Sequence, residues 1–337
     1  MRSTSNFISN PERISRGARV LFRAMRPVHT DILIPETRFT PEDFEYALYC
    51  QKGKAFRTVM LLYGMTIEGK DDVRVMNFAR SCANAGLRVI VPHLPGLMGF
   101  LVEQSDLLRL ESILKNAAQE SDEKIGLIGF STGGSYSLLL SANPSLSEMI
   151  GPVVLFSPIY DVRVVAERLH APFNPPPQAE KDWDQYYWAQ YVIAMRNRDQ
   201  LGLTEAVQEA LQILLADYDN YEPEVKQAFF DKHIGPLKLI ERSDLVFEGV
   251  TLDVLSARGH LAAVKSPVFI LHDASDQLVP PEQSRRMHSE LALRGPGFRQ
   301  EILVTPWLSH VAMKNSGSPA ELFRIVSFIS ELFRITH

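Results

Sequence analysis

The feature that most constrains this chain is a short apolar run that leads into a serine flanked by two glycines. Residues 124–128 are rich in isoleucine and predict a buried strand, and residues 132–140 can continue as a helix. Between them, Gly129, Ser131 and Gly133 match the pattern G-x-S-x-G. In a strand–turn–helix context, this pattern is typical of a sharp turn that lifts the serine hydroxyl clear of the sheet edge. Free N–H groups at the helix start favour negative charge on a nearby oxygen. The stretch therefore predicts that Ser131 is a nucleophile.

The structural alternative is an ordinary glycine-rich turn, such as that of a nucleotide-binding crossover. The stretch around Ser131 contains neither G-x-G-x-x-G nor G-x-x-x-x-G-K-[ST], the patterns that cradle phosphates. This absence favours the nucleophile.

Composition narrows the class of protein. The chain has 337 residues, 45% of them apolar and 22% charged, which fits one large α/β domain with an insertion or two ordinary domains. The net charge of −5 gives no reason to expect a nucleic acid partner. Cys50 and Cys82 are too few for a disulfide framework or a zinc site, so we expect a reducing, cytoplasmic compartment. No apolar run reaches 18 residues, so we expect no transmembrane helix.

Residues 1–30 differ from the rest because six arginines face one acidic residue, Glu12. The arginines are Arg2, Arg13, Arg16, Arg19, Arg23 and Arg26. Asn10, Pro11 and Glu12 form a good helix start, and the helix is expected to run to about Met25. We favour a helix packed on the domain with its arginines in water. Contact with an anionic membrane surface and import into an organelle are the two alternatives.

Strands and helices alternate along most of the chain. The strands are predicted at 32–34, 46–51, 58–62, 87–91, 124–128, 151–156, 268–272 and 299–304, and the helices at 71–85, 105–118, 132–140, 281–293 and 319–333. We expect a tight hairpin turn at 52–54. Such alternation predicts an α/β fold with a mostly parallel central sheet flanked by helices.

The alternation stops after Asp161 for about a hundred residues. A proline-rich stretch at 172–177 is followed by helical patterns at 181–196, 204–216 and 222–233. We therefore divide the chain into four parts. They are a basic helical extension (1–30), a first core part (31–160), an inserted helical cap (161–264) and a second core part (265–337).

A serine nucleophile needs a base within hydrogen-bond reach and a carboxylate that orients the base. Asp276 follows the strand predicted at 268–272 and stands before Val279 and Pro280, and His310 follows the next strand. Both segments leave the carboxyl ends of their strands, where open parallel sheets carry their sites.

With these motifs the chain resembles the α/β-hydrolase superfamily, and within it the capped serine hydrolases of esterase or lipase type. The resemblance spans about residues 31–337 and rests on the turn at Ser131, the Asp-x-x-Val-Pro at Asp276 and the isolated His310. Residues 92–96 are also similar to the P-D-x-P-G turn of that superfamily, with His93 in place of aspartate. The resemblance implies that Ser131 is the nucleophile, Asp276 the acid and His310 the base, with no cofactor or metal.

Other residues are alternatives for the acid and the base. The rival acids are Asp161 and Asp273, and the alternative bases are His93, His260 and His272. Asp276 is favoured because Val279 and Pro280 follow it, as in the superfamily.

The superfamily also implies an oxyanion hole built from two backbone N–H groups. One comes from Thr132, and the other from the loop after the strand at 58–62. The superfamily usually has His-Gly in that loop, whereas this chain has Tyr63 and Gly64. We predict Met65 as the second donor, with Thr66 as the alternative.

The predicted cap begins with an aromatic helix that places Trp183, Tyr187 and Tyr191 on one face. This face is expected to pack the cap onto the core, and the alternative is an apolar wall over the substrate. The expected reaction is hydrolysis of a hydrophobic carboxylic ester, a small-molecule substrate, through an acyl-enzyme. Acyl transfer and thioester, amide or C–C bond cleavage use the same groups, and a non-catalytic binding protein is the alternative from another class.

Overall fold

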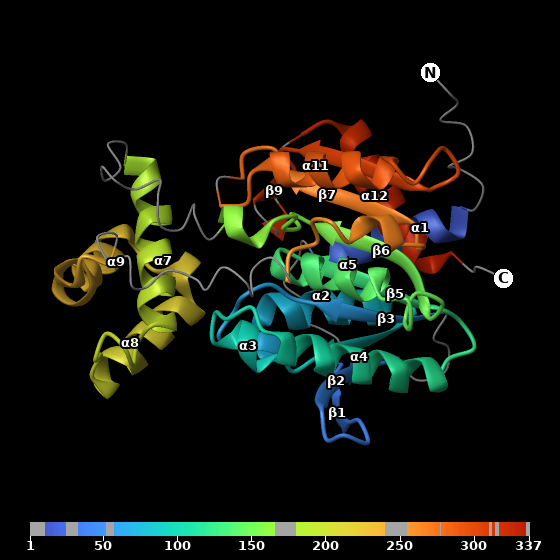
Figure 1. The fold of residues 1–337 in the computed structure, drawn as a ribbon. Coiled ribbons are helices and arrows are strands. Elements are labelled where there is room, and N and C mark those ends of the chain that lie inside the picture. The colour runs from blue at the N-terminus through green and yellow to red at the C-terminus, as the bar shows by residue number, and fades with distance from the viewer. Residues whose placement is uncertain are drawn as a thin grey trace.

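The computed structural model describes residues 11–24, 33–51, 57–165, 180–239, 255–276, 278–309, 312–313 and 317–334. Its centre is an eight-stranded sheet with helices on both faces (Figure 1). The strands are β1 (Glu36–Phe39), β2 (Glu45–Tyr49), β3 (Arg57–Leu62), β4 (Leu87–Pro92), β5 (Ile125–Phe130), β6 (Ile150–Phe156), β7 (Val268–Asp273) and β8 (Gln300–Thr305).

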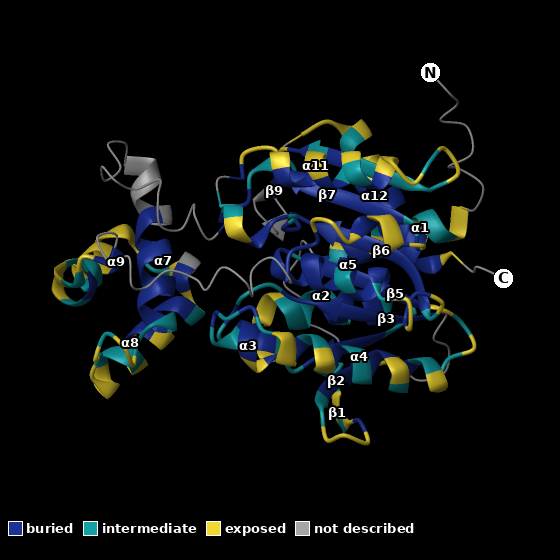
Figure 2. Ribbon diagram, in the orientation of Figure 1, coloured by how far each residue is buried: buried dark blue, intermediate teal, exposed yellow. Residues whose placement is uncertain are grey.

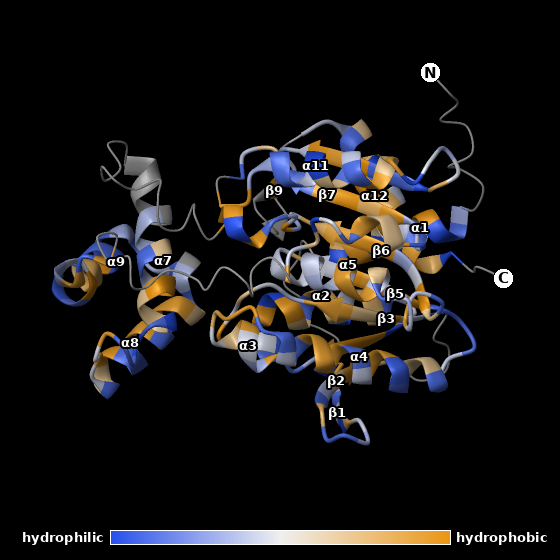
Figure 3. Cartoon of the chain, viewed as in Figure 1, coloured by the Kyte–Doolittle hydropathy of each residue, from blue (hydrophilic) through white to orange (hydrophobic). Residues whose placement is uncertain are grey.

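The sheet order is β1-β2-β4-β3-β5-β6-β7-β8, and within it only β2 runs against the other strands. This is the strand order of the α/β-hydrolase fold, so the predicted fold class is confirmed. The central strands are buried on both faces, as expected of a covered parallel sheet. Figure 3 shows these strands as largely apolar.

Two layers of helices cover the sheet. α1 (Pro11–Ala24), α2 (Val73–Asn84) and α12 (Pro319–Ser330) pack together, and α4 (Gln104–Gln119) packs against α5 (Thr132–Ala142). Two glycines of β5, three positions apart, show that these layers lie on opposite faces. A Cβ atom at Gly129 would meet α5, whereas one at Gly126 would meet Leu332, just beyond α12. The remaining core helices are α3 (Pro95–Met98) and α11 (Pro281–Ala292).

The predicted hairpin between the second and third strands is wrong. β4 lies between β2 and β3, antiparallel to β2 and parallel to β3. β2 forms its hairpin with β1 instead, where Asp43 takes a positive φ of 64° in the turn. The physical reason is burial, because the apolar strands β3 and β4 take central positions and leave β2 near the edge. Residues 52–56 lie outside the described part of the chain.

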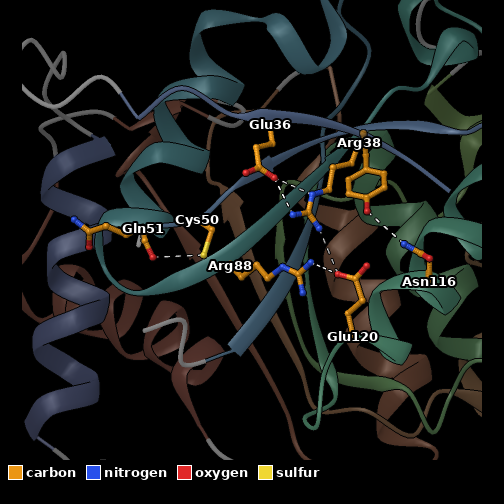
Figure 4. Close-up of polar contacts among 8 residues, drawn as sticks. Glu36, Arg38, Cys50, Gln51, Arg88, Asn116 and Glu120 are labelled. Atoms are coloured by element: carbon orange, nitrogen blue, oxygen red, sulfur yellow. Dashed lines mark hydrogen bonds and ion pairs between the residues drawn. The ribbon is translucent and has the colours of Figure 1, made fainter. Parts of the chain in front are cut away.

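The first strand also begins later than the predicted 32–34. Leu33 and Ile34 precede β1, and Ile34 is 76% exposed. The edge hairpin is instead held by polar contacts to α4 (Figure 4). Arg38 of β1 and Arg88 of β4 both pair with Glu120, just after α4. Asn116 also donates a hydrogen bond to the Tyr46 hydroxyl at 3.3 Å.

The N-terminal helix packs on the core. Val20 and Leu21 are fully buried, and a Cβ at Gly17 would lie 2.7 Å from the carbonyl oxygen of Val326. Arg16 donates to the carbonyl of Ala85 at 3.1 Å. These contacts support the packed interpretation, while membrane contact and organelle import stay predictions. In the described ranges, no helix combines the length and the hydrophobicity needed to cross a membrane.

A helical cap is inserted between β6 and β7, as predicted. It contains α7 (Glu180–Arg196), α8 (Glu205–Ala216) and α9 (Pro223–Phe229). Figure 2 shows α7 buried along most of its described length. The Tyr187 and Tyr191 rings contact Phe230 and Phe229, respectively. These two residues of the aromatic face therefore pack within the cap, whereas the sequence predicted packing onto the core. The Trp183 side chain lies outside the described part.

Contacts between residues at the two ends of the insertion hold it to the core. Asp161 pairs with Arg258 at 3.0 Å, and the N–H of Val162 donates to the Ser256 hydroxyl at 2.9 Å. The chain therefore leaves and re-enters the core at one place.

Candidate active site

Ser131 lies at a sharp turn between β5 and α5. Its φ of 50° and ψ of −118° fall in a region that costs a non-glycine residue strain energy. The turn is held by the Ser131 N–H, which donates to the Phe156 carbonyl at 2.9 Å. The predicted strained turn is therefore present, and it fixes the position of the serine.

The two flanking glycines are required by close packing. A Cβ at Gly129 would lie 2.6 Å from the Cα of Gly134, and one at Gly133 would lie 2.2 Å from the carbonyl oxygen of Leu62. Real Cβ atoms do not approach other atoms this closely. The turn therefore packs directly against the chain at the end of β3.

The loop after β3, residues 63–66, lies beside Ser131. A Cβ at Gly64 would be 3.1 Å from the Cβ and 3.7 Å from the Oγ of Ser131. The N–H of Thr132, at the first position of α5, has no acceptor within its helix. Among the described residues, neither this N–H nor that of Met65 has a hydrogen-bond acceptor. Both predicted donors are thus available next to the serine.

Tyr63 anchors this loop where the superfamily usually has histidine. Its hydroxyl accepts a hydrogen bond from the N–H of Leu94 at 2.9 Å, and burial raises the pKa of that hydroxyl. The tyrosine is therefore a neutral structural link between the ends of β3 and β4. No local sequence pattern indicates this contact.

Asp276 is buried just beyond the carboxyl end of β7. Its Oδ1 accepts the N–H of Val279 at 2.8 Å, and its Oδ2 lies 3.7 Å from Nε2 of His272. The valine of the Asp-x-x-Val-Pro motif thus fixes the carboxylate through its backbone. Asp276 and Ser131 follow strands at the same edge of the sheet, as a triad requires.

His310 lies outside the described residues. Of the residues around it, 308–309 and 312–313 are described, and β9 (Leu308–Ser309) pairs antiparallel with β10 (Ala312–Met313). β9 contacts β7, the strand that leads to Asp276. β9 therefore lies near the strand that carries the predicted acid, and the role of His310 as the base stays a prediction.

His272 is not suited to act as the base. Its fully buried ring has Nε2 at 2.7 Å from the carbonyl oxygen of Val279 and Nδ1 at 2.6 Å from the Ser284 hydroxyl. A carbonyl only accepts, so Nε2 carries the proton and Nδ1 accepts from Ser284. Both ring nitrogens are already engaged. His93 is half-buried and His260 is exposed, and the structure assigns neither a catalytic contact.

The rival acids have other partners. Asp161 accepts the N–H of Arg163 at 3.1 Å besides its ion pair with Arg258. Asp273 accepts both the N–H and the hydroxyl of Ser275, each at 2.9 Å. Both carboxylates thus stabilise their own loops, and the assignment of Asp276 as the acid stays a prediction. In the described ranges, no group of three or more His, Cys, Asp or Glu side chains is arranged to hold a metal ion.

Comparison with known proteins gives a likeness of fold at low identity. No family model and no curated protein matches the sequence. Among solved structures, an esterase of Pyrococcus furiosus is 15% identical, with 80% of this chain and 79% of that chain covered and a TM-score of 0.46. A meta-cleavage product hydrolase is 17% identical, with 81% and 90% covered and a TM-score of 0.43.

The acylaminoacyl peptidase of Pyrococcus horikoshii is 14% identical, with 80% of this chain covered and a TM-score of 0.42. The matched region spans only 36% of that peptidase. At these levels the comparisons transfer no activity, and the strand order carries the fold assignment.

Proposed function

We propose that the chain is a serine hydrolase that cleaves a carboxylic ester with a hydrophobic acyl or alcohol group. The observation that carries the proposal is the strained turn at Ser131, with the available N–H groups of Thr132 and Met65 beside it. Strain of this kind persists only where the surrounding structure imposes it, and it is concentrated at functional sites.

The proposed reaction proceeds in two halves. His310 takes the proton from the Ser131 hydroxyl as its Oγ attacks the ester carbonyl carbon, and Asp276 stabilises the resulting imidazolium. The N–H groups of Thr132 and Met65 stabilise the oxyanion of the tetrahedral intermediate. The intermediate collapses to an acyl-serine as His310 protonates the leaving alcohol. Water then attacks the acyl-serine with the same base, which releases the acid and restores the serine.

Contacts around the proposed oxyanion donor support a hydrophobic substrate. The buried apolar side chains of α7 and α8, with Phe100, Tyr218, Ile234 and Leu239, form a cap cluster that is separate from the hydrophobic core around the sheet. The side chains of Met65 and Leu278 are partly buried and pack against both the core and the cap cluster. Phe100 of the core is buried in the cap cluster. Apolar side chains therefore lie between the Ser131 region and the cap, where an acyl or alcohol group would be desolvated.

An ester is the least demanding acyl substrate for this machinery, because its alcohol leaves more easily than an amine. Thioester, amide and C–C bond cleavage and acyl transfer to an alcohol remain the competing reactions. Comparing kcat/KM for substrates that differ only in the scissile bond would rank these reactions. A comparison of KM for short and long acyl chains would show whether the apolar side chains between the Ser131 region and the cap contribute to substrate binding.

Labelling with a fluorophosphonate probe tests the proposal. The wild type should be labelled and should hydrolyse p-nitrophenyl esters of graded chain length, whereas Ser131→Ala should do neither. Ser145→Ala, at an exposed serine, is the matched control and should behave as the wild type. A wild type that is neither labelled nor active would instead support a non-catalytic binding protein.

A further inference from the structure

The loop after β3 is closed by a buried hydrogen bond that the proposed mechanism does not use. The Thr66 hydroxyl donates to Oδ2 of Asp72 at 2.7 Å, and the Thr66 carbonyl accepts the N–H of Gly69 at 3.2 Å. Thr66 is 8% exposed and Asp72 is 2% exposed. The residue next to the proposed donor Met65 is therefore held through both its side chain and its backbone.

Asp72 is itself fixed to a rigid element. Its Oδ1 accepts the N–H of Arg74 at 2.8 Å and caps α2, and the Arg74 guanidinium contacts both carboxylate oxygens at 2.7 and 3.1 Å. Burial alone would raise the pKa of Asp72, but the hydrogen bonds from Arg74 and Thr66 hold it below its usual range. The carboxylate is thus a charged acceptor for Thr66, anchored to α2.

The other end of the loop is fixed as well. Tyr63 is buried and linked to Leu94, and Gly69 has a positive φ of 57° that brings it against Tyr63. A Cβ at Gly69 would lie 3.0 Å from the Tyr63 hydroxyl oxygen and 2.7 Å from the sulfur of Met98. Residues 63–72 therefore form a compact loop that is anchored at both ends, with Gly64 beside Ser131.

We propose that Thr66 and Asp72 are positioning residues, which hold the Met65 N–H in the direction of the oxyanion. This inference rests on the proposed function. An N–H group stabilises the transition state only if its orientation is set before the reaction, because reorientation during the reaction costs the energy gained. The peptide that carries the Met65 N–H follows Gly64, which has no side chain, so its orientation is set from the other side, by the packed Met65 side chain and the anchored Thr66.

Thr66→Val is the most direct test, since valine has the same shape and lacks the hydroxyl. Loss of a whole donor costs about a hundred- to thousand-fold in rate, so a loosened donor should cost about ten- to a hundred-fold. The loss should fall on kcat with KM unchanged, because the ground-state carbonyl gains little from the donor. A trifluoromethyl ketone, which forms a tetrahedral oxyanion on a serine, should bind more weakly by the same factor.

Two variants serve as controls. Thr66→Ser retains the hydroxyl and should restore kcat to within about two- or three-fold, as expected when a single group carries the effect. Thr204→Val removes another threonine hydroxyl that caps α8 in the cap, and it should leave kcat and ketone affinity unchanged. Rates are normalised to the fraction of enzyme that the fluorophosphonate titrates.

If Thr66→Val does not fold, Asp72→Asn gives the same comparison. Asparagine is also a good helix cap, but the amide nitrogen that replaces Oδ2 no longer accepts from Thr66. An equal loss of kcat and ketone affinity supports the proposal. Wild-type kcat in these variants, or a kcat loss without a loss of ketone affinity, overturns it. The proposed function fails separately, if the wild type itself is neither labelled nor active.

Discussion

Replacing Gly133 by alanine tests how tightly the turn at Ser131 is packed against the end of β3 and the loop after it. The new Cβ would lie 2.2 Å from the carbonyl oxygen of Leu62 and 2.5 Å from that of Tyr63. Such contacts rarely fall below 3.0 Å, so α5 and the end of β3 must separate by at least 0.8 Å, the difference between 3.0 and 2.2 Å. Both contacts are to backbone atoms, so no side-chain rotation relieves them.

The separation moves the Met65 donor relative to Ser131. A displacement of about 1 Å in a reactive geometry can cost about a hundred-fold in rate. Overpacking of this kind typically costs about 1–3 kcal/mol of stability, so the variant should still fold. We therefore expect kcat/KM for a p-nitrophenyl ester to fall by about a hundred-fold.

The assay compares kcat/KM, thermal stability and fluorophosphonate titration in the wild type and two variants. Gly297→Ala is the matched control, since a Cβ there meets nothing within 4 Å. It should be indistinguishable from the wild type. A folded Gly133→Ala enzyme with kcat/KM within three-fold of the wild type would refute the tight packing of the turn against the loop.

Three further predictions concern residues around the site. Burial raises the pKa of Asp106 from 3.8 to about 6, so the folded state keeps a proton that the unfolded chain releases. Stability should therefore fall by about 3 kcal/mol in total between about pH 3 and pH 7. Asp106→Asn should remove this decline in urea unfolding, and an equal decline in both proteins would contradict the assignment. Phe100→Gly relieves a positive φ of 58° but removes a side chain from the cap cluster, so KM should rise more for long-chain than for short-chain esters. Equal rises in KM would exclude a role of Phe100 in acyl binding. Trp307→Phe removes the hydrogen bond from the indole Nε1 to the Ser318 carbonyl. This bond joins the two ends of the segment that carries His310, so its loss should lower kcat by about ten-fold. An unchanged kcat would show that this bond does not position the base.

The local parts of the fold could be predicted because local chemistry determines them. The turn at Ser131 is indicated by two glycines at which any Cβ would be crowded, and the cap helices follow from their periodicity. The Asp-x-x-Val-Pro pattern likewise has a local cause, since the Val279 N–H fixes the Asp276 carboxylate. In each case the residues that form the sequence signal lie within a few positions of one another along the chain.

Contacts between distant residues could not be predicted in the same way. The pairing of β2 with β1 and β4 depends on which strands bury the most apolar surface, and the turn-like residues at 52–54 gave a misleading local signal. The link from Tyr63 to Leu94 joins residues 31 positions apart, and no pattern in either segment indicates the other. Thr66 and Asp72 are close in sequence, but neither belongs to a recognised motif.

The proposed catalysis requires that Ser131 and His310 act together. The most direct measurement is the rate of fluorophosphonate labelling, with the modified residue identified by mass spectrometry. The label should be on Ser131, and His310→Ala should slow labelling by at least about a thousand-fold, while His260→Ala should leave it unchanged. Labelling of another residue, or His310→Ala labelled as fast as the wild type, would contradict the proposed triad.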